Sequence, residues 1–136
     1  MLHFEHKIRV RYVECDQMGF VHHSVYPIYF EEARTEVLRE VGLIYSEMEK
    51  ENIIMPVRKM DINYYYAAKY DDILRIEITM DKLPLLKCDL SYKVFNQRNE
   101  ILTEASMQLF FANKLTLRPM RIPEKYQEMM VKYNTK

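Results

Sequence analysis

Apolar and charged side chains alternate between residues 4 and 13, with the period of a strand that buries one face. The apolar positions are Phe4, Ile8, Val10 and Tyr12, and His6 falls on the same side. The charged positions on the other side are Glu5, Lys7, Arg9 and Arg11. This pattern predicts a strand from Phe4 to Val13, and we expect His3 and His6 to be ordinary strand residues.

After residue 23 the period changes to that of a helix. The apolar positions, three or four residues apart, are Tyr26, Phe30, Ala33, Val37 and Val41. We expect Ser24 to be the N-cap and Pro27 to lie in the first turn. Gly42 is the expected end of the helix. A charged stretch over residues 43–52 is expected to add a short helical segment.

The rest of the chain contains four alternating runs. The first run has its apolar residues at Met60, Ile62, Tyr64 and Tyr66, and Pro56 leads into it as an edge residue or a bulge. The apolar positions of the later runs are Leu74, Ile76, Ile78 and Met80, then Leu86, Cys88, Leu90, Tyr92 and Val94, then Ile101, Ala105, Met107, Leu109 and Phe111. Short, turn-prone separators favour sequential antiparallel strands. An irregular segment from Lys114 to Arg121 and a terminal helix over Pro123 to Tyr133 complete the pattern.

Together these elements predict an α+β fold in which one long helix covers the apolar face of a five-stranded antiparallel sheet. At 136 residues the chain is expected to form one domain, spanning residues 1–136. A single principal helix leaves the sheet edges and part of the sheet surface open. This favours self-association.

Composition narrows the function classes. Lys plus Arg and Asp plus Glu number 20 each, so the formal charge is zero and no overall field favours nucleic acid or an anionic membrane. Two cysteines, Cys15 and Cys88, are too few for a disulfide framework. No apolar run approaches the roughly 20 residues that span a bilayer, and no signal peptide precedes the first charged residues. We therefore expect a cytoplasmic protein without a membrane span.

Polar chemistry concentrates between the first strand and the long helix, where Cys15, Asp16, His22 and His23 lie around Gly19. Free backbone N–H groups at a helix N-terminus stabilise negative charge. If the loop folds back, the Asp16 carboxylate and such an N–H flank one carbonyl carbon, which suits acyl transfer or hydrolysis. A thioester fits so weak a base, because its carbonyl is activated and its thiolate leaves readily.

Other roles remain open for the same residues. Asp16 can simply form the turn, and Cys15 can act as a nucleophile with His22 or His23 as its base. The four polar residues can also be considered as metal ligands, but their spacing matches no recognised zinc pattern, and no metal is expected.

Farther along, Glu31 or Glu32 can face a cleft as a base or lie on the helix surface. The basic residues that can receive phosphates, or form a solvated segment, are Lys114, Arg118 and Arg121.

Two groups of residues carry a resemblance to a known family. They are Tyr12, Glu14, Asp16, Gly19, Val21, His23 and Tyr26, followed by Tyr29, Glu31, Ala33, Arg34 and Glu36. At these spacings the chain resembles the hot-dog-fold acyl-CoA thioesterases of the 4-hydroxybenzoyl-CoA thioesterase type, and among them the bacterial Tol-Pal-associated branch. The order of elements agrees over nearly the whole chain.

The resemblance implies a helix wrapped by a sheet, active as a homodimer or homotetramer without a cofactor. Asp16 matches the catalytic carboxylate, and His23 matches the residue whose backbone N–H polarises the thioester carbonyl, with a side chain that can orient water or substrate. Gly19 permits the turn between them. Cys15 stands where threonine is common and His22 where tyrosine is common, which leaves acyl preference and pH dependence open.

Three functions fit these expectations. The first is an acyl-CoA thioesterase, with substrate contacts expected from Tyr26, Glu31, Lys114, Arg118 and Arg121. The second is a thioesterase for acyl carrier protein, whose acidic surface would require the basic residues as a docking patch. The third is a module that binds an acyl group or CoA without catalysis.

Overall fold

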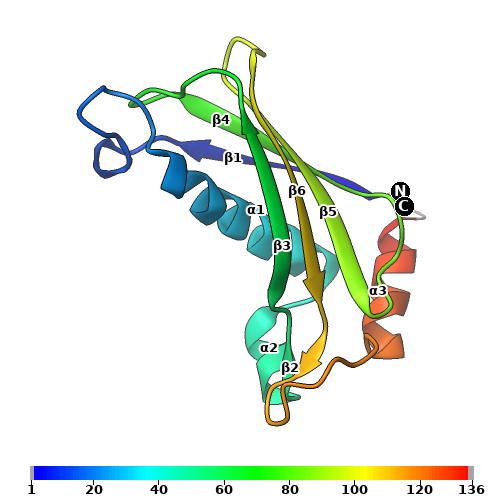
Figure 1. Ribbon diagram of the computed structural model, residues 1–136. Helices are drawn as coiled ribbons and strands as arrows, with labels where there is room; N and C mark the ends of the chain where they lie inside the picture. The colour runs from blue at the N-terminus through cyan, green and yellow to red at the C-terminus, as the bar shows by residue number, and fades with distance from the viewer. Residues whose placement is uncertain (1, 135–136) are drawn as a thin grey trace.

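The computed structural model describes residues 2–134, in which a curved antiparallel sheet lies against one long helix (Figure 1). The five strands of the sheet are β1 (Leu2–Arg9), β3 (Val57–Tyr64), β4 (Ile73–Met80), β5 (Lys87–Phe95) and β6 (Ile101–Phe110). Their order is β1-β4-β5-β6-β3, so β4, β5 and β6 form the expected meander, whereas β3 pairs with β6 at the far edge. The α+β class and the five-stranded antiparallel sheet are confirmed.

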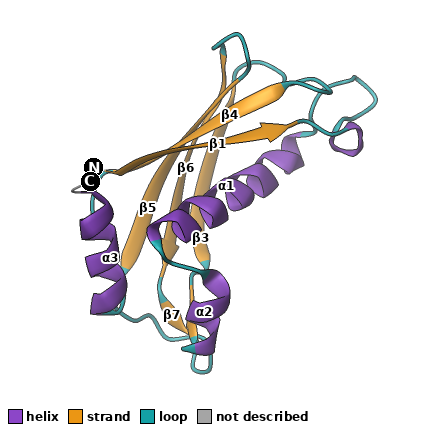
Figure 2. Cartoon of the chain, turned by 180° about the vertical axis from the view of Figure 1, so that it is seen from behind, coloured by secondary structure: helices purple, strands orange, loops and turns teal. Residues whose placement is uncertain are grey.

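The long helix α1 (Tyr26–Val41) lies along the concave side of the sheet (Figure 2). Its buried side chains include the apolar positions expected from the sequence: Tyr26, Phe30, Ala33, Val37 and Val41. The ring of Phe30 packs on Tyr92 of β5, with centroids 4.5 Å apart. Burying a large apolar side chain contributes roughly 1.5–3 kcal/mol, so this helix face holds the sheet and helix together.

The smaller elements lie at one end of the sheet. They are α2 (Tyr45–Lys50), the short paired strands β2 (Ile53–Ile54) and β7 (Ala112–Asn113), and α3 (Glu124–Asn134). The short helical segment after Gly42 and the terminal helix are confirmed, whereas the β2–β7 pair is not predicted by the sequence pattern. Within residues 2–134, no helix is both long and apolar enough to cross a membrane.

The first strand ends earlier than the alternating pattern predicts. β1 stops at Arg9, and Tyr12–Glu14 form a 3₁₀ turn, η1, in which Tyr12 is 80% exposed. The Glu14 carboxylate accepts a hydrogen bond from the Arg11 N–H at 2.7 Å, and this contact bends the chain. The prediction of a strand up to Val13 is therefore wrong, because a local side-chain contact overrides the alternation.

The start of the long helix also differs from expectation. A 3₁₀ turn, η2 (His23–Val25), leads into α1, and the side chain that caps it is His22, whose Nδ1 accepts the Ser24 N–H at 3.2 Å. The prediction of Ser24 as the N-cap is wrong. Pro27 lies in the first turn as expected. Gly42 ends the helix with φ of +107°, and its N–H donates to the carbonyls of Leu38 and Arg39.

Strand β3 ends at Tyr64, so Tyr66 lies outside the strand in which the alternation places it. The N–H groups of Tyr65 and Tyr66 both donate to the Leu102 carbonyl, at 2.8 Å and 3.2 Å, which turns the chain out of the ladder. β3 is an edge strand with a bulge near Val57, and its residues are exposed or half-buried.

Candidate active site

Residues 15–21 form a small closed loop between β1 and α1. Cys15 and Val21 pair as an antiparallel bridge, the Asp16 N–H donates to the Phe20 carbonyl at 2.9 Å, and the Gly19 N–H donates to the Asp16 carbonyl at 3.0 Å. Gly19 has φ of +84°, a conformation that favours glycine. The turn that the sequence assigns to Gly19 is present.

The two oxygens of the Asp16 carboxylate have different surroundings. Oδ1 accepts the N–H of Met18 at 2.9 Å and the N–H of Phe20 at 3.3 Å, so it holds the loop. Oδ2 has no hydrogen-bond partner among residues 2–134. One oxygen therefore fixes the carboxylate in place, and the other is left for a ligand or a reaction.

A buried carboxylate anchors this loop to the helix. Glu14 is 7% exposed and accepts the Tyr29 hydroxyl at 2.8 Å, while its own carbonyl accepts the His22 N–H at 3.0 Å. Burial by itself raises the pKa of Glu14, but hydrogen bonds from the Arg11 N–H, the Tyr29 hydroxyl and the Arg11 guanidinium together lower it. The burial of Tyr29 and its bond to the carboxylate raise the pKa of the phenol.

The loop also rests on the segment that follows β3. The Val21 N–H donates to the Ala68 carbonyl at 2.9 Å, and Phe20 forms an isolated bridge with Lys69. The loop is thus held by backbone contacts at both ends, which presents Asp16 at a fixed position beside the start of α1.

At the start of η2, the His23 N–H has no hydrogen-bond partner in the part of the chain that the structure describes. The first N–H groups of a helical segment lack partners within the helix and favour negative charge. The carbonyl of the same residue accepts the Tyr64 hydroxyl at 3.0 Å. The centroids of the His22 and His23 imidazole rings lie 4.2 Å apart.

Asp16 and His23 line one open pocket of about 310 Å³. Its other lining residues are Met18, Phe20, Val21, Tyr26, Tyr64, Tyr65, Tyr66 and Ala67. Tyr26 is only 2% exposed and forms the inner wall, and burial raises the pKa of its phenol. The pocket thus combines a carboxylate, a helix N-terminus and a mainly apolar wall.

The wall contains residues that the motif does not single out. Tyr64, Tyr65 and Tyr66 come from the end of the edge strand and from the segment after it. Three consecutive tyrosines at the end of an alternating run are the signal in the sequence that points to such an aromatic surface.

The remaining expected substrate contacts lie elsewhere in the single chain. Glu31 is exposed on α1 and does not line this pocket. Lys114, Arg118 and Arg121 are exposed on the segment after β7, which lies at the opposite end of the sheet from the loop between β1 and α1 (Figures 1 and 2).

Cys15 is partly buried, and burial and then the carboxylates of Asp16 and Glu14 raise the pKa of its thiol. The thiolate is the reactive form, so this environment disfavours Cys15 as a nucleophile.

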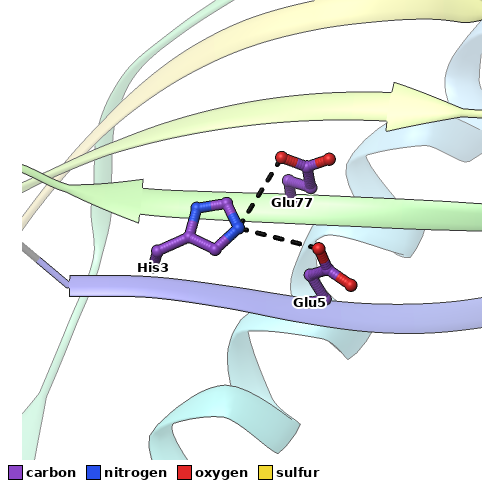
Figure 3. A group of neighbouring side chains, drawn as sticks. All are labelled: His3, Glu5 and Glu77. Carbon is purple, nitrogen blue, oxygen red and sulfur yellow. Dashed lines mark ion pairs between the residues drawn. The ribbon is translucent and has the colours of Figure 1, made fainter.

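One group of metal-type ligands occurs within residues 2–134, and it lies away from the pocket. His3, Glu5 and Glu77 share the surface of β1 and β4, with His3 Nε2 3.7 Å from Glu5 and 3.6 Å from Glu77 (Figure 3). Glu5 and Glu77 are opposite each other in the ladder, a pairing of like charges that is unfavourable alone. Arg75 forms an ion pair with Glu77 at 3.1 Å, so the chain itself supplies a compensating positive charge.

Comparisons with known proteins agree on the family. The family model described as the thioesterase-like superfamily matches residues 10–130. The acyl-CoA thioester hydrolase YbgC of Escherichia coli O157:H7 is 30% identical over 121 residues, which are 89% of this chain and 90% of the relative.

Solved structures extend the agreement to the fold. The DHNA-CoA thioesterase from Staphylococcus aureus has a TM-score of 0.91 at 29% identity, covering 99% of this chain and 93% of that one. Slr0204, a 1,4-dihydroxy-2-naphthoyl-CoA thioesterase from Synechocystis, has a TM-score of 0.88 and covers 97% and 98%, but at 15% identity it shows likeness of fold alone. The chain adopts the hot-dog fold and belongs to the thioesterase-like superfamily.

Proposed function

We propose that this chain is an acyl-CoA thioesterase, which hydrolyses an acyl thioester to the free acid and CoA. The observation that carries the proposal is that Asp16 and His23 line one pocket, and that each has a group without a partner within residues 2–134: Asp16 Oδ2 and the His23 N–H. The names of the relatives, acyl-CoA thioester hydrolase and DHNA-CoA thioesterase, point to the same class of reaction.

In the proposed reaction, the thioester carbonyl is activated from two sides. The His23 N–H donates to the carbonyl oxygen and stabilises the negative charge that develops there. Asp16 either attacks the carbonyl carbon or accepts a proton from an attacking water molecule. If Asp16 attacks, the C–S bond breaks as a mixed anhydride forms, and water then hydrolyses the anhydride to the free acid and restores the carboxylate. If Asp16 acts as a base, water forms the new C–O bond as the C–S bond breaks, and the proton that Asp16 accepts passes to the leaving thiolate.

The pocket wall suits the apolar part of such a substrate. Met18, Phe20 and the three tyrosines give an apolar and aromatic lining to the pocket that Asp16 also lines. Apolar walls with a few placed polar groups are typical of small-molecule sites. The acyl group or the pantetheine arm is the part that we place against this lining.

We also propose that the active form is a homodimer joined along the β3 edges, with a homotetramer as a pair of dimers. β3 offers an unpaired edge, and Val57 and Tyr64 near its ends are 46% and 49% exposed. A twofold axis across this edge places the Val57 end of one strand beside the Tyr64 end of the other.

This arrangement gives the basic residues a role. The segment after β7 lies beyond the Val57 end of β3 (Figure 1), so the proposed axis carries Lys114, Arg118 and Arg121 of each protomer toward the other protomer's pocket. Phosphates of CoA are the groups that these side chains would bind. Glu31, exposed on α1, is proposed to contact substrate in the same assembled form.

Finer assignments rest on the motif alone. The spacing of Asp16, Gly19 and His23 supports the 4-hydroxybenzoyl-CoA thioesterase type and its Tol-Pal-associated branch. We further propose that residues 1–136 form one domain and that the protein acts in the cytoplasm.

A substrate panel tests the proposed function. Release of free thiol is measured with acetyl-CoA, palmitoyl-CoA, an aromatic acyl-CoA and an acyl group carried on acyl carrier protein. We expect hydrolysis of at least one acyl-CoA. Faster hydrolysis on the carrier protein would favour the carrier-protein thioesterase, and CoA binding without hydrolysis of any member would favour the non-catalytic module.

A further inference from the structure

The Tyr64 side chain ties the sheet to the start of the long helix. Tyr64 is the last residue of β3, and its hydroxyl donates to the carbonyl of His23, the first residue of η2, at 3.0 Å. Its ring meets the buried ring of Tyr26 edge-on, with centroids 5.4 Å apart. Tyr64 is 49% exposed, so the packing of its ring covers only part of the side chain and the hydroxyl contact helps to set its position.

The His23 carbonyl lies in the 3₁₀ turn η2, before the first residue of α1, and it accepts the Tyr64 hydroxyl from the end of β3. Because the carbonyl and the N–H of His23 flank the same Cα, a bond that fixes the carbonyl also limits how far the N–H can turn.

We propose that Tyr64 is a positioning residue, whose hydroxyl holds the first turn of the helical segment so that the His23 N–H points into the pocket. This inference rests on the proposed function, in which that N–H polarises the thioester carbonyl. A hydrogen-bond donor stabilises a developing oxyanion only if it is already oriented before the reaction, and small misplacements weaken it steeply.

The test removes the hydroxyl and keeps the ring. Tyr64→Phe retains the contact with Tyr26 and the pocket wall, so we expect kcat to fall about tenfold, a part of the effect of losing an oxyanion donor, with KM changed less than about twofold. The control is Tyr70→Phe, because Tyr70 is exposed, lies outside the pocket lining, and its hydroxyl has no hydrogen-bond partner within residues 2–134. Thermal unfolding of both variants reports whether either change acts through stability.

The outcomes separate this inference from the proposed function. Wild-type hydrolysis with equal kcat for Tyr64→Phe and Tyr70→Phe would overturn the positioning role and leave the thioesterase standing. A rise in KM alone would overturn it too, because Tyr64 would then bind substrate. An inactive wild type over the whole substrate panel would remove the proposed function, and the positioning role with it.

Discussion

The geometry of the Asp16 carboxylate allows both roles that the sequence presents as alternatives, turn formation and catalysis. Oδ1 forms the turn by accepting the N–H groups of Met18 and Phe20, while Oδ2 faces no partner within residues 2–134. A side chain that is held through one oxygen loses little further freedom when the other oxygen reacts. The turn-forming and catalytic interpretations of Asp16 are therefore compatible.

At Gly19 the backbone conformation, and not the available space, limits substitution. Its φ is +84°, and among residues 2–134 no heavy atom outside Gly19 and its two chain neighbours lies within 4 Å of where a Cβ would be. We expect Gly19→Ala to lower the free energy of unfolding by about 1 kcal/mol, with a smaller loss for Gly19→Asn, because asparagine adopts this region more readily. Urea denaturation measures both, and equal stability of Gly19→Ala and wild type would contradict this account of the turn.

The buried Glu14 predicts a dependence of stability on pH. Its pKa in the folded state lies below the ordinary value of 4.5, so its contribution is fully present above that value and is lost as the pH falls through the lowered folded-state pKa. We expect Glu14→Gln to unfold about 1–3 kcal/mol more easily at pH 7, with the difference from wild type narrowing toward pH 3.

Denaturant unfolding between pH 3 and pH 7 measures this difference. The exposed Glu128, replaced by Gln, is the matched control and should follow the wild type at every pH. A difference between Glu14→Gln and wild type that stays constant down to pH 3 would show that the charge of Glu14 is not what stabilises the loop.

At the scale of the elements, single residues in the sequence predict where the long helix starts and ends. Pro27 and Gly42 mark the first turn and the end of α1, because proline fits a helix start and glycine adopts the positive φ that ends one. The residue that caps the start of the helical segment could not be predicted in this way. Ser24 has the right residue type, yet His22 accepts the Ser24 N–H because the preceding residues are fixed by Glu14, whose carbonyl holds the His22 N–H.

The position of β3 in the sheet cannot be predicted from the residues of the strand itself. Its alternation predicts a strand, but pairing with β6 at the far edge depends on contacts between residues 57–64 and 103–109, far apart in the chain. The lining of the pocket is therefore only partly predictable from the sequence. Asp16 and His23 are found by spacing and resemblance, whereas Tyr64, Tyr65 and Tyr66 join them only because the sheet carries the end of β3 to the start of α1.

The residues that carry the family resemblance fall into two groups, one that holds the fold together and one that lines the pocket. Glu14 and Tyr29 hold the loop to the helix, and Arg34 is buried, with its Nε–H donating to the Tyr45 hydroxyl at 2.9 Å. Asp16 and His23 face the pocket. Several residues of the motif therefore stabilise the junction between strand and helix, and only some of them line the pocket.

At the scale of the whole molecule, the chain separates a carboxylate pocket at one end of the sheet from basic residues at the other (Figure 2). A twofold assembly along β3 would bring these parts together between protomers. The substrate site would then combine Asp16 of one copy with the basic segment after β7 of the second copy.

Mixed dimers test this arrangement. Asp16→Asn removes the carboxylate, and the double variant Lys114→Glu with Arg118→Glu reverses the basic charge, so each alone should be weakly active. After the two are unfolded and refolded together, a site shared between copies predicts recovery of about one quarter of wild-type activity, because half of a random mixture is heterodimer with one intact site of two. No recovery, with dimers confirmed by sedimentation, would place both groups in one chain's site.

The central claim is that Asp16 carries the thioesterase reaction, and Asp16→Asn tests it most directly. Asparagine keeps an oxygen that accepts the Met18 and Phe20 N–H groups, so the loop should persist while the charge is lost. On the best substrate of the panel, we expect kcat to fall by about 100-fold or more, with thermal unfolding unchanged and the exposed Asp81→Asn at the wild-type rate. An Asp16→Asn variant that turns over this substrate at a near-normal rate would contradict the account.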